Sequence, residues 1–346
     1  MLCNTYARHD RFTTKQYTMS FLSAHLNIVQ LIGLLALASQ SKGQALQGCA
    51  AVDCPNRYQD VLSPTCQVES TDMGLIGLLS TDSSVLQSNL TWTIGDSGLQ
   101  STIDGNERTV TRTFYLGVPE HVDLTSSNTS VAGCAIFIIS PDTGAYQVYD
   151  QGAPQYVNAA SCVASMGETC IDDLTIRLEQ LAHSTSDSNA DSFCKAIADG
   201  LGEESPSSCL ISRQQPRIEA VALTGSTAPK PITAGQNSTS NCWPTLPKTN
   251  DLTKVFEYEH VAWLNETVPW LGYTPLITVF ASEQDGQERK VEVEVECMKI
   301  VDSDDFSAGT VRNGTNSGSM EGSAISVRVG QGIFGLATGI WLMLIV

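Results

Sequence analysis

The sequence predicts a mainly β protein: an antiparallel β-sandwich that carries a small helical hairpin stapled by disulfides. Three observations predict this class. Short apolar or alternating segments of strand length recur along the chain. One region, about residues 162–209, shows apolar residues at helical spacing instead. Ten cysteines lie between two apolar segments near the ends of the chain, which indicates export and disulfide formation.

The predicted strands are spread over most of the chain. They contain residues 90–94, 110–116, 133–139, 218–223, 255–264, 276–281 and 291–300. Apolar residues alternate with Thr in the first two segments, whereas residues 133–139 form a continuous apolar run, typical of a central strand covered on both faces. The favoured turn dipeptide Asp285-Gly286 predicts a hairpin between the last two strands.

The last predicted strand has two unlike faces. Val291, Val293, Val295 and Cys297 point one way, and Glu292, Glu294 and Glu296 point the other. We interpret the three glutamates as a solvent-facing strand surface and not as an acidic site.

The helical region contains two amphipathic segments. Their apolar positions are Ile171, Leu174, Leu178 and Leu181, followed by Phe193, Ile197 and Leu201. A polar turn, residues 183–191, separates them, so we expect a helical hairpin inserted into the β body.

Residues 1–45 are expected to be an N-terminal extension and a signal peptide. The apolar segment 28–38 is too short to span a bilayer, and Ala36-Leu37-Ala38 and Gly43-Gln44-Ala45 are both candidate cleavage sites. Met1 and Met19 both remain candidate start residues. The folded body is expected to cover residues 46–302.

The carboxy-terminal part is expected to be a lipid-anchor signal. Residues 303–324 form a Ser/Gly/Thr-rich stalk with the anchor site, and residues 325–346 form a propeptide with a hydrophobic tail. Small residues, a polar spacer and an apolar tail are the pattern of a GPI attachment signal. Gly322 is the first candidate attachment residue, Asn316 and Ser317 are alternatives, and a short tail-anchor helix is the competing interpretation.

The cysteines after the signal segment form an even set, which predicts five disulfides. They are Cys49, Cys54, Cys66, Cys134, Cys162, Cys170, Cys194, Cys209, Cys242 and Cys297. Sequence alone does not fix their connectivity; within the helical region we expect Cys162 to pair with Cys209 and Cys170 with Cys194. Their long, irregular spacing argues against a metal site, and so do the scattered residues His121, His183 and His260.

Five sequons predict N-glycosylation on exposed loops: Asn89, Asn128, Asn237, Asn265 and Asn313. The chain has 37 Asp and Glu against 19 Lys and Arg, and a net charge of −18. Such a surface repels phosphate backbones, so we expect no nucleic-acid partner. We also expect no cofactor and no metal ion, because Asp302, Asp304 and Asp305 lack the spacing of a calcium loop.

One segment suggests nucleophilic catalysis. Gly95-Asp96-Ser97-Gly98 is similar to the nucleophile segments of trypsin-like proteases and of GDS-type esterases, but every histidine of the body follows Ser97, which excludes the first family by residue order. The residue order of GDS-type esterases permits His260 as the base, although those esterases are α/β folds. The competing interpretation of this segment is a turn that ends the preceding strand.

Aromatic residues suggest glycan binding as another alternative. Trp263, Trp270 and Tyr273 lie close together in the sequence, beside a Pro/Gly loop, and could stack on sugar rings. The competing interpretation is that they belong to the core.

Several segments together resemble secreted, cysteine-rich glycoproteins of filamentous ascomycete fungi, often of the GPI-anchored type. The resemblance rests on residues 90–95, 112–119, 133–137 and 241–247 and covers about residues 49–305. It implies a fungal cell surface or wall and carries over no catalytic residue.

From the sequence we therefore expect a structural or adhesive cell-surface glycoprotein that is not an enzyme. Its partners would be the membrane, through a lipid anchor, and cell-wall polysaccharide. A glycan-binding module and a secreted Ser hydrolase are the alternatives.

Overall fold

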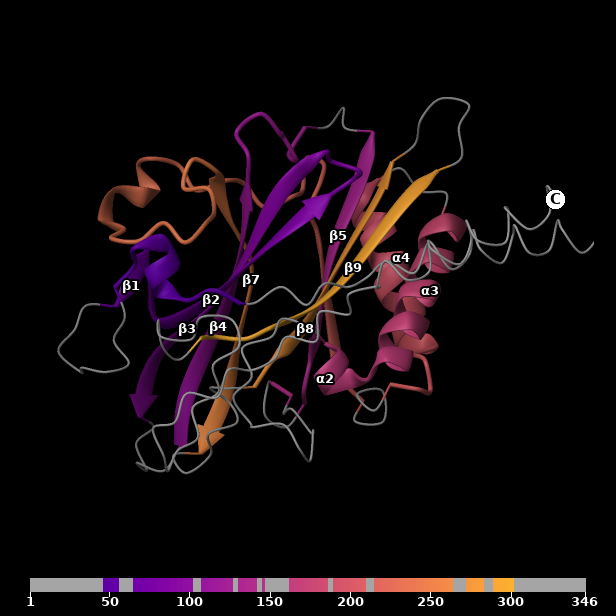
Figure 1. Cartoon of the computed structure of the whole chain (residues 1–346), viewed down its shortest axis with the longest axis horizontal. Helices are drawn as coiled ribbons and strands as arrows, with labels where there is room; N and C mark the ends of the chain where they lie inside the picture. Colours follow the sequence, from indigo (N-terminus) through magenta and orange to yellow (C-terminus); the bar gives the residue numbers. More distant parts are fainter. Residues whose placement is uncertain are drawn as a thin grey trace, which may run out of the picture. The chain divides into compact units, whose positions relative to one another are not determined.

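The computed structural model describes residues 46–55, 65–101, 107–126, 130–141, 145–146, 162–185, 189–209, 215–263, 272–282 and 289–301 (Figure 1). The expected signal peptide, stalk and anchor signal, with Gly322, lie outside these ranges. So do Asn128, Asn265, Trp270, Asn313, Asp302, Asp304 and Asp305. Within the described ranges, no helix has both the length and the apolar character needed to cross a membrane.

The chain is mainly β, with two antiparallel sheets, two long helices and several disulfides. The five-stranded sheet has the order β1-β2-β3-β4-β7 and the four-stranded sheet the order β6-β5-β8-β9. The strands are β1 (Cys66–Val68), β2 (Thr71–Ser83), β3 (Ser88–Ser101), β4 (Glu107–Val118), β5 (Val131–Ile139), β6 (Arg217–Ala222), β7 (Asp251–Trp263), β8 (Thr274–Ser282) and β9 (Lys290–Met298). All seven predicted strands are present.

One apolar core is shared by the two sheets. Trp92 and Phe114 from the five-stranded sheet lie in the same buried cluster as Phe137 and Phe280 from the four-stranded sheet. The ring centroids of Phe114 and Phe137 are 4.8 Å apart. The indole Nε1 of Trp92 donates a hydrogen bond of 3.1 Å to Oγ1 of Thr278, so this buried polar atom is also satisfied across the core.

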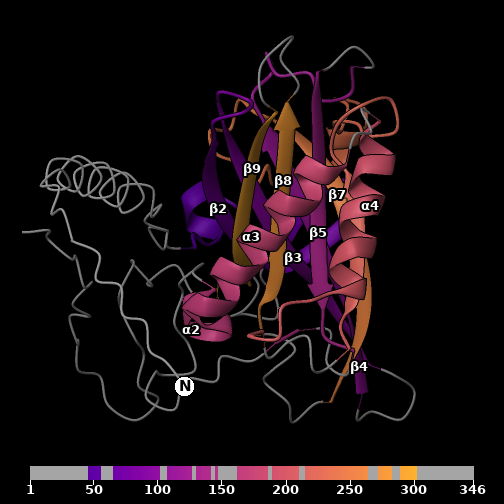
Figure 2. The ribbon, with the colours of Figure 1, turned by 90° about the vertical axis from the view of Figure 1, so that its right-hand side faces the viewer.

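The opposite face of the four-stranded sheet is covered by the helices α3 (Glu168–Ser184) and α4 (Ala190–Glu203), and α2 (Val163–Met166) precedes them (Figure 2). Leu174 and Leu178 of α3 and Phe193 and Ile197 of α4 are buried against this sheet. The predicted helical hairpin is confirmed. Asn189 caps α4, since its side-chain oxygen accepts hydrogen bonds from the backbone N–H groups of Asp191 and Ser192.

Strand β2 is absent from the sequence prediction because its apolar run contains glycines and does not alternate. Both of its faces are covered: Ile76 lies in a cluster on the outer face of the sheet, and Leu79 lies in the shared core. Gly77 is required by a close approach, since a Cβ there would overlap the carbonyl oxygen of Lys299. The segment after β9 also hydrogen-bonds to this strand, from Val301 N to Ile76 O at 3.1 Å.

The predicted turn at residues 95–98 is wrong. These residues lie inside β3, where Gly95 faces Thr113 and Asp96 faces Arg112 on β4. A register shift follows Ser97, so the irregularity of this segment is a bulge within the strand pair.

Asp96 and Arg112 form a buried ion pair on the inner face of the five-stranded sheet, and their side chains are 1% and 0% exposed. Nε and Nη2 of Arg112 each donate to the carboxylate at 2.8 Å, and Nη1 donates to Gly272 O and Thr274 Oγ1 at 3.2 Å. Burial alone lowers the pKa of Arg112, but Asp96 and Tyr258 raise it by more, so the guanidinium stays charged. The pair therefore links the five-stranded sheet to the start of β8.

We expect Asp96→Asn to lower the free energy of unfolding by about 3 kcal/mol, because it leaves the Arg112 charge buried without a counter-ion. Denaturant unfolding of the disulfide-bonded protein measures this. The control is Lys195→Ala, which removes an exposed ion pair with Asp199 and should cost less than about 0.5 kcal/mol. Equal effects of the two substitutions would contradict the assigned role of the buried pair.

Candidate functional site

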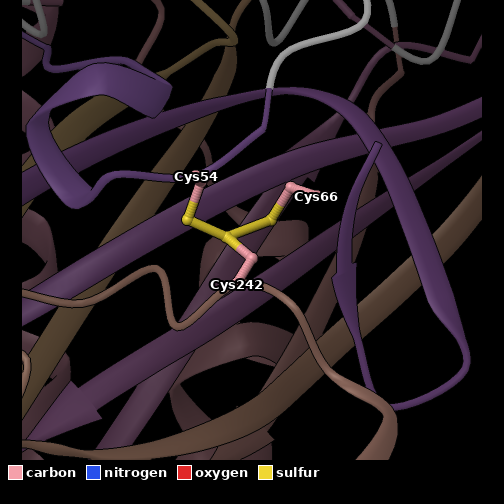
Figure 3. Close-up of side chains that lie close together, drawn as sticks. All are labelled: Cys54, Cys66 and Cys242. Atoms are coloured by element: carbon pink, nitrogen blue, oxygen red, sulfur yellow. A yellow bond between two sulfur atoms is a disulfide. The ribbon is translucent and has the colours of Figure 1, made fainter. Parts of the chain in front are cut away.

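Three cysteine side chains converge on the outer face of the five-stranded sheet. Cys54, Cys66 and Cys242, here called the cysteine cluster, have Sγ atoms that all lie within 4.8 Å of one another (Figure 3). They are 8%, 0% and 6% exposed, respectively. Around them pack Val52, Val68 and Tyr115, so the cluster lies in an apolar environment.

Each cysteine of the cluster comes from a different segment. Cys54 follows the 3-10 helix η1 (Cys49–Val52), and its backbone N–H donates to Cys49 O at 3.0 Å. Cys66 begins β1 and faces Met73 on β2. Cys242 lies in the loop between the 3-10 helix η3 (Gln236–Thr239) and β7.

Asn241 attaches the loop that carries Cys242 to strand β1. Its Oδ1 accepts from Gln67 N at 2.7 Å, its backbone N–H donates to Gln67 O at 3.1 Å, and its Nδ2 donates to Thr65 O at 2.9 Å. These bonds satisfy the free edge of a three-residue strand. They also hold Cys242 beside Cys66.

Two disulfides are compatible with this arrangement. The Cα atoms of Cys54 and Cys242 are 5.1 Å apart, and those of Cys66 and Cys242 are 5.3 Å apart. Both distances lie in the usual range for disulfides. Because a cysteine sulfur takes part in one disulfide at a time, the two bonds are alternatives. In their reduced form, the three thiolates are also a ligand set for Zn²⁺ or Cu⁺.

The long spacing between these cysteines is therefore no argument against a metal site, contrary to the reasoning from sequence. Cys54 and Cys66 are separated from Cys242 by 188 and 176 residues. Only the fold brings the three sulfurs together.

The disulfides expected within the helical region are wrong. Cys170 pairs with Cys209, Cys162 with Cys297 on β9, and Cys134 on β5 with Cys194 on α4. The first bond braces the helical region internally, and the other two attach it to the four-stranded sheet. The expectation considered only cysteines that are close in sequence, but the buried side of each helix faces the sheet.

Ser97 and His260 are not brought together. Ser97 faces Thr111 on β4, and Thr111 faces Glu259 on β7, so these three residues share one face of the sheet. His260 is the neighbour of Glu259 and therefore lies on the other face, beside Tyr258 at a ring distance of 5.9 Å. Ser97 Oγ donates to Thr111 O at 3.3 Å. The geometry does not support a Ser–His pair.

The aromatic candidates for glycan binding do not form a described platform. Tyr273 is 3% exposed, and its ring centroid lies 5.9 Å from that of Tyr146, so no free ring face is left for a sugar. For Trp263 the structure describes the backbone at the end of β7 but not the side chain, and Trp270 lies outside the described residues. Tyr273 is a core residue.

A cavity of about 320 Å³ lies elsewhere, where the end of β4, the loop after it, residues 223–231 and the start of β7 meet. Its lining mixes apolar residues such as Val118, Leu223 and Pro229 with polar ones, including the exposed residues Glu120 and Asp123. Among its lining residues there is no aromatic ring, no cysteine and no histidine. The cavity offers neither a stacking surface nor a nucleophile–base pair.

The glutamate face of β9 is less exposed than the sequence predicts. Glu292, Glu294 and Glu296 are each half-buried, because this face is turned toward the five-stranded sheet and the β2–β3 hairpin. One carboxylate oxygen of Glu292 accepts hydrogen bonds from the backbone N–H groups of Ser84 and Val85. Burial raises the pKa of Glu296 to about 8 and that of Glu294 to about 7, with smaller contributions from neighbouring carboxylates.

This burial generates a pH-dependent prediction. The folded state holds a proton on Glu296 up to a higher pH than the unfolded chain, so wild-type stability falls as the pH rises from about 5 toward 8. Glu296→Gln removes the titration. We expect the variant to be more stable than wild type at pH 9, by more than about 1 kcal/mol, and nearly equal to it at pH 5.

Thermal unfolding at both pH values measures the difference. The matched control is Glu259→Gln, at an exposed position on β7, whose effect should be the same at both pH values. A Glu296→Gln effect that is independent of pH would contradict the burial argument.

Comparison of the chain with protein-family models, with curated proteins and with solved structures returned no match to any of them. The assignment of function therefore rests on the chemistry of the residues described above.

Proposed function

We propose that this protein is an exported glycoprotein of a fungal cell surface or cell wall, GPI-anchored, with a structural or adhesive role and no catalytic machinery. Its body, residues 46–302, would be a β-sandwich braced by disulfides. The signal-like segment 28–38 and the tail that follows Gly322 support export and anchoring.

The observation that carries the proposal is the set of buried disulfides between segments far apart in the chain. Cys162 and Cys297 are separated by 135 residues, and Cys134 and Cys194 by 60. Disulfides of this kind persist in oxidising compartments and are rare in the cytosol. They also attach the start of α2 and helix α4 to the four-stranded sheet.

The sandwich part of the proposal is supported by the shared core. Phe256 of the five-stranded sheet and Phe137 of the four-stranded sheet stack with a centroid distance of 4.5 Å. Apolar side chains of both sheets thus interdigitate over the facing surfaces, which is how sandwich cores are built.

A role without catalysis is favoured over a hydrolase by the separation of Ser97 from His260 on opposite faces of one sheet. A glycan-binding role remains the alternative through Trp263 and Trp270. A structural or adhesive function needs only a rigid body held away from the membrane, and the Ser/Gly/Thr-rich residues 303–324 suit such a spacer.

The anchor can be tested on intact cells. We expect a phosphatidylinositol-specific phospholipase to release the full-length protein, expressed in a filamentous fungal host, and to move it from the detergent phase to the aqueous phase. The control is a chain truncated after Asn316, which should appear in the medium without the enzyme. Protein that stays with the cells and retains the peptide 325–346 would contradict the proposal.

The described sequons differ in their geometry, which gives a second test. Asn89 is exposed beside the β2–β3 hairpin, whereas Oδ1 of Asn237 is buried and the residue is half-buried. We expect Asn89→Gln to increase electrophoretic mobility before treatment with an N-glycosidase, and Asn237→Gln to leave the mobility unchanged. No effect of Asn89→Gln would argue against glycosylation at the hairpin.

A further inference from the structure

The cysteines fall into two groups. Six of the ten described cysteines form three disulfides in which each residue has a single partner: Cys134–Cys194, Cys162–Cys297 and Cys170–Cys209. The other four, Cys49 and the cysteine cluster, lie together in one buried cluster on the outer face of the five-stranded sheet. In this second group the choice of partner is open, because Cys242 is within bonding distance of two residues.

The two possible partners approach Cys242 equally well. Their Cα atoms lie 5.1 and 5.3 Å from that of Cys242, both inside the range that a disulfide needs. Each partner is also fixed independently. Cys54 is held by its hydrogen bond to Cys49, and Cys66 by its pairing with Met73. Neither bond therefore requires a rearrangement of the sheet.

We propose that Cys54, Cys66 and Cys242 form an internal thiol–disulfide exchange site in which Cys242 is bonded alternately to Cys54 and to Cys66. The thiolate of Cys66 attacks Sγ of Cys242 in the Cys54–Cys242 disulfide. A new bond forms between Cys66 and Cys242, and the bond between Cys54 and Cys242 breaks. Cys54 leaves as a thiolate and takes up the proton that Cys66 gave up. The step involves no net oxidation, so it needs no external oxidant.

The exchange would move a covalent link between two segments. In one state the loop that carries Cys242 is joined to the segment 46–55, and in the other it is joined to β1. Cys54 is 8% exposed and Cys66 is fully buried. In the state with a Cys66–Cys242 bond the third sulfur belongs to the slightly exposed Cys54, and in the other state it belongs to the fully buried Cys66.

Exchange is favoured over a metal site by the chemical setting. The remaining described disulfides show that the fold pairs its cysteines, and thiolate ligands for Zn²⁺ or Cu⁺ would require all three sulfurs to stay reduced. The exchange requires the third sulfur of the cluster as a thiol. Because Cys49 lies in the same buried cluster, a disulfide of Cys49 with Cys54 or Cys66 in the purified protein would overturn the proposal.

The test maps disulfides in the purified full-length protein. Acid quenching and alkylation trap the thiols, and an N-glycosidase then removes glycans. Trypsin cleaves at Arg57, between Cys54 and Cys66, so peptides that link each of them to the Cys242 peptide have different masses. We expect both linkages in one preparation, at levels well above any scrambling of Cys170–Cys209, and we expect a trace of reduced thiol to redistribute them.

Three variants complete the test. Cys54→Ser should give only the Cys66–Cys242 linkage, and Cys66→Ser only the Cys54–Cys242 linkage, with the other three disulfides unchanged. Cys49→Ser should retain both linkages. A single Cys242 linkage in wild type that a reduced thiol does not redistribute would overturn the proposal. Three reduced thiols with a bound zinc or copper ion, detected by intact mass, would also overturn it.

Discussion

The architecture depends on one constraint: both faces of β5 must be covered. Residues of this strand alternate between two cores. Ala135, Phe137 and Ile139 point to the core shared by the sheets, and Cys134 and Ile136 point to the core under the helices. A strand that is apolar on both faces is stable only in the middle layer of three. The five-stranded sheet provides one outer layer, and α3 and α4 provide the other.

This constraint explains which parts of the fold could be predicted from the sequence. The continuous run 133–139 indicates a doubly covered strand, and the helical spacing of Leu174, Leu178, Phe193 and Ile197 indicates an element to cover it. The connectivity of the cysteines could not be predicted in the same way. Cys134 and Cys194 meet because a helix lies on a strand, and that contact exists only in three dimensions.

The same layered structure explains why the sequence alone did not show which charged residues are buried. Alternation correctly places Arg112 on one face with Val110 and Phe114, but it does not say that this face is the inner one. An arginine is usually expected to face solvent unless a buried acidic partner is known. The partner here, Asp96, could not be recognised because it lies in a segment that resembles a turn. For the glutamates of β9, the sequence predicted a solvent-facing surface, but the structure buries about half of it. Their strand has apolar side chains toward the helices, so the acidic face is turned toward the other sheet and is half-buried.

In the cysteine cluster, the two alternative disulfides differ little in the free energy that they contribute through the unfolded chain. The chain entropy that a disulfide removes from the unfolded state depends on the logarithm of the loop length. Loops of 188 and 176 residues differ by less than about 0.1 kcal/mol in this contribution. The unfolded chain therefore gives no preference between Cys54 and Cys66 as partners of Cys242. Any preference must come from the folded state, where both partners lie at nearly the same Cα distance from Cys242. Contacts that hold the loop, above all those of Asn241 with β1, are then the features that would set the ratio of the two bonds.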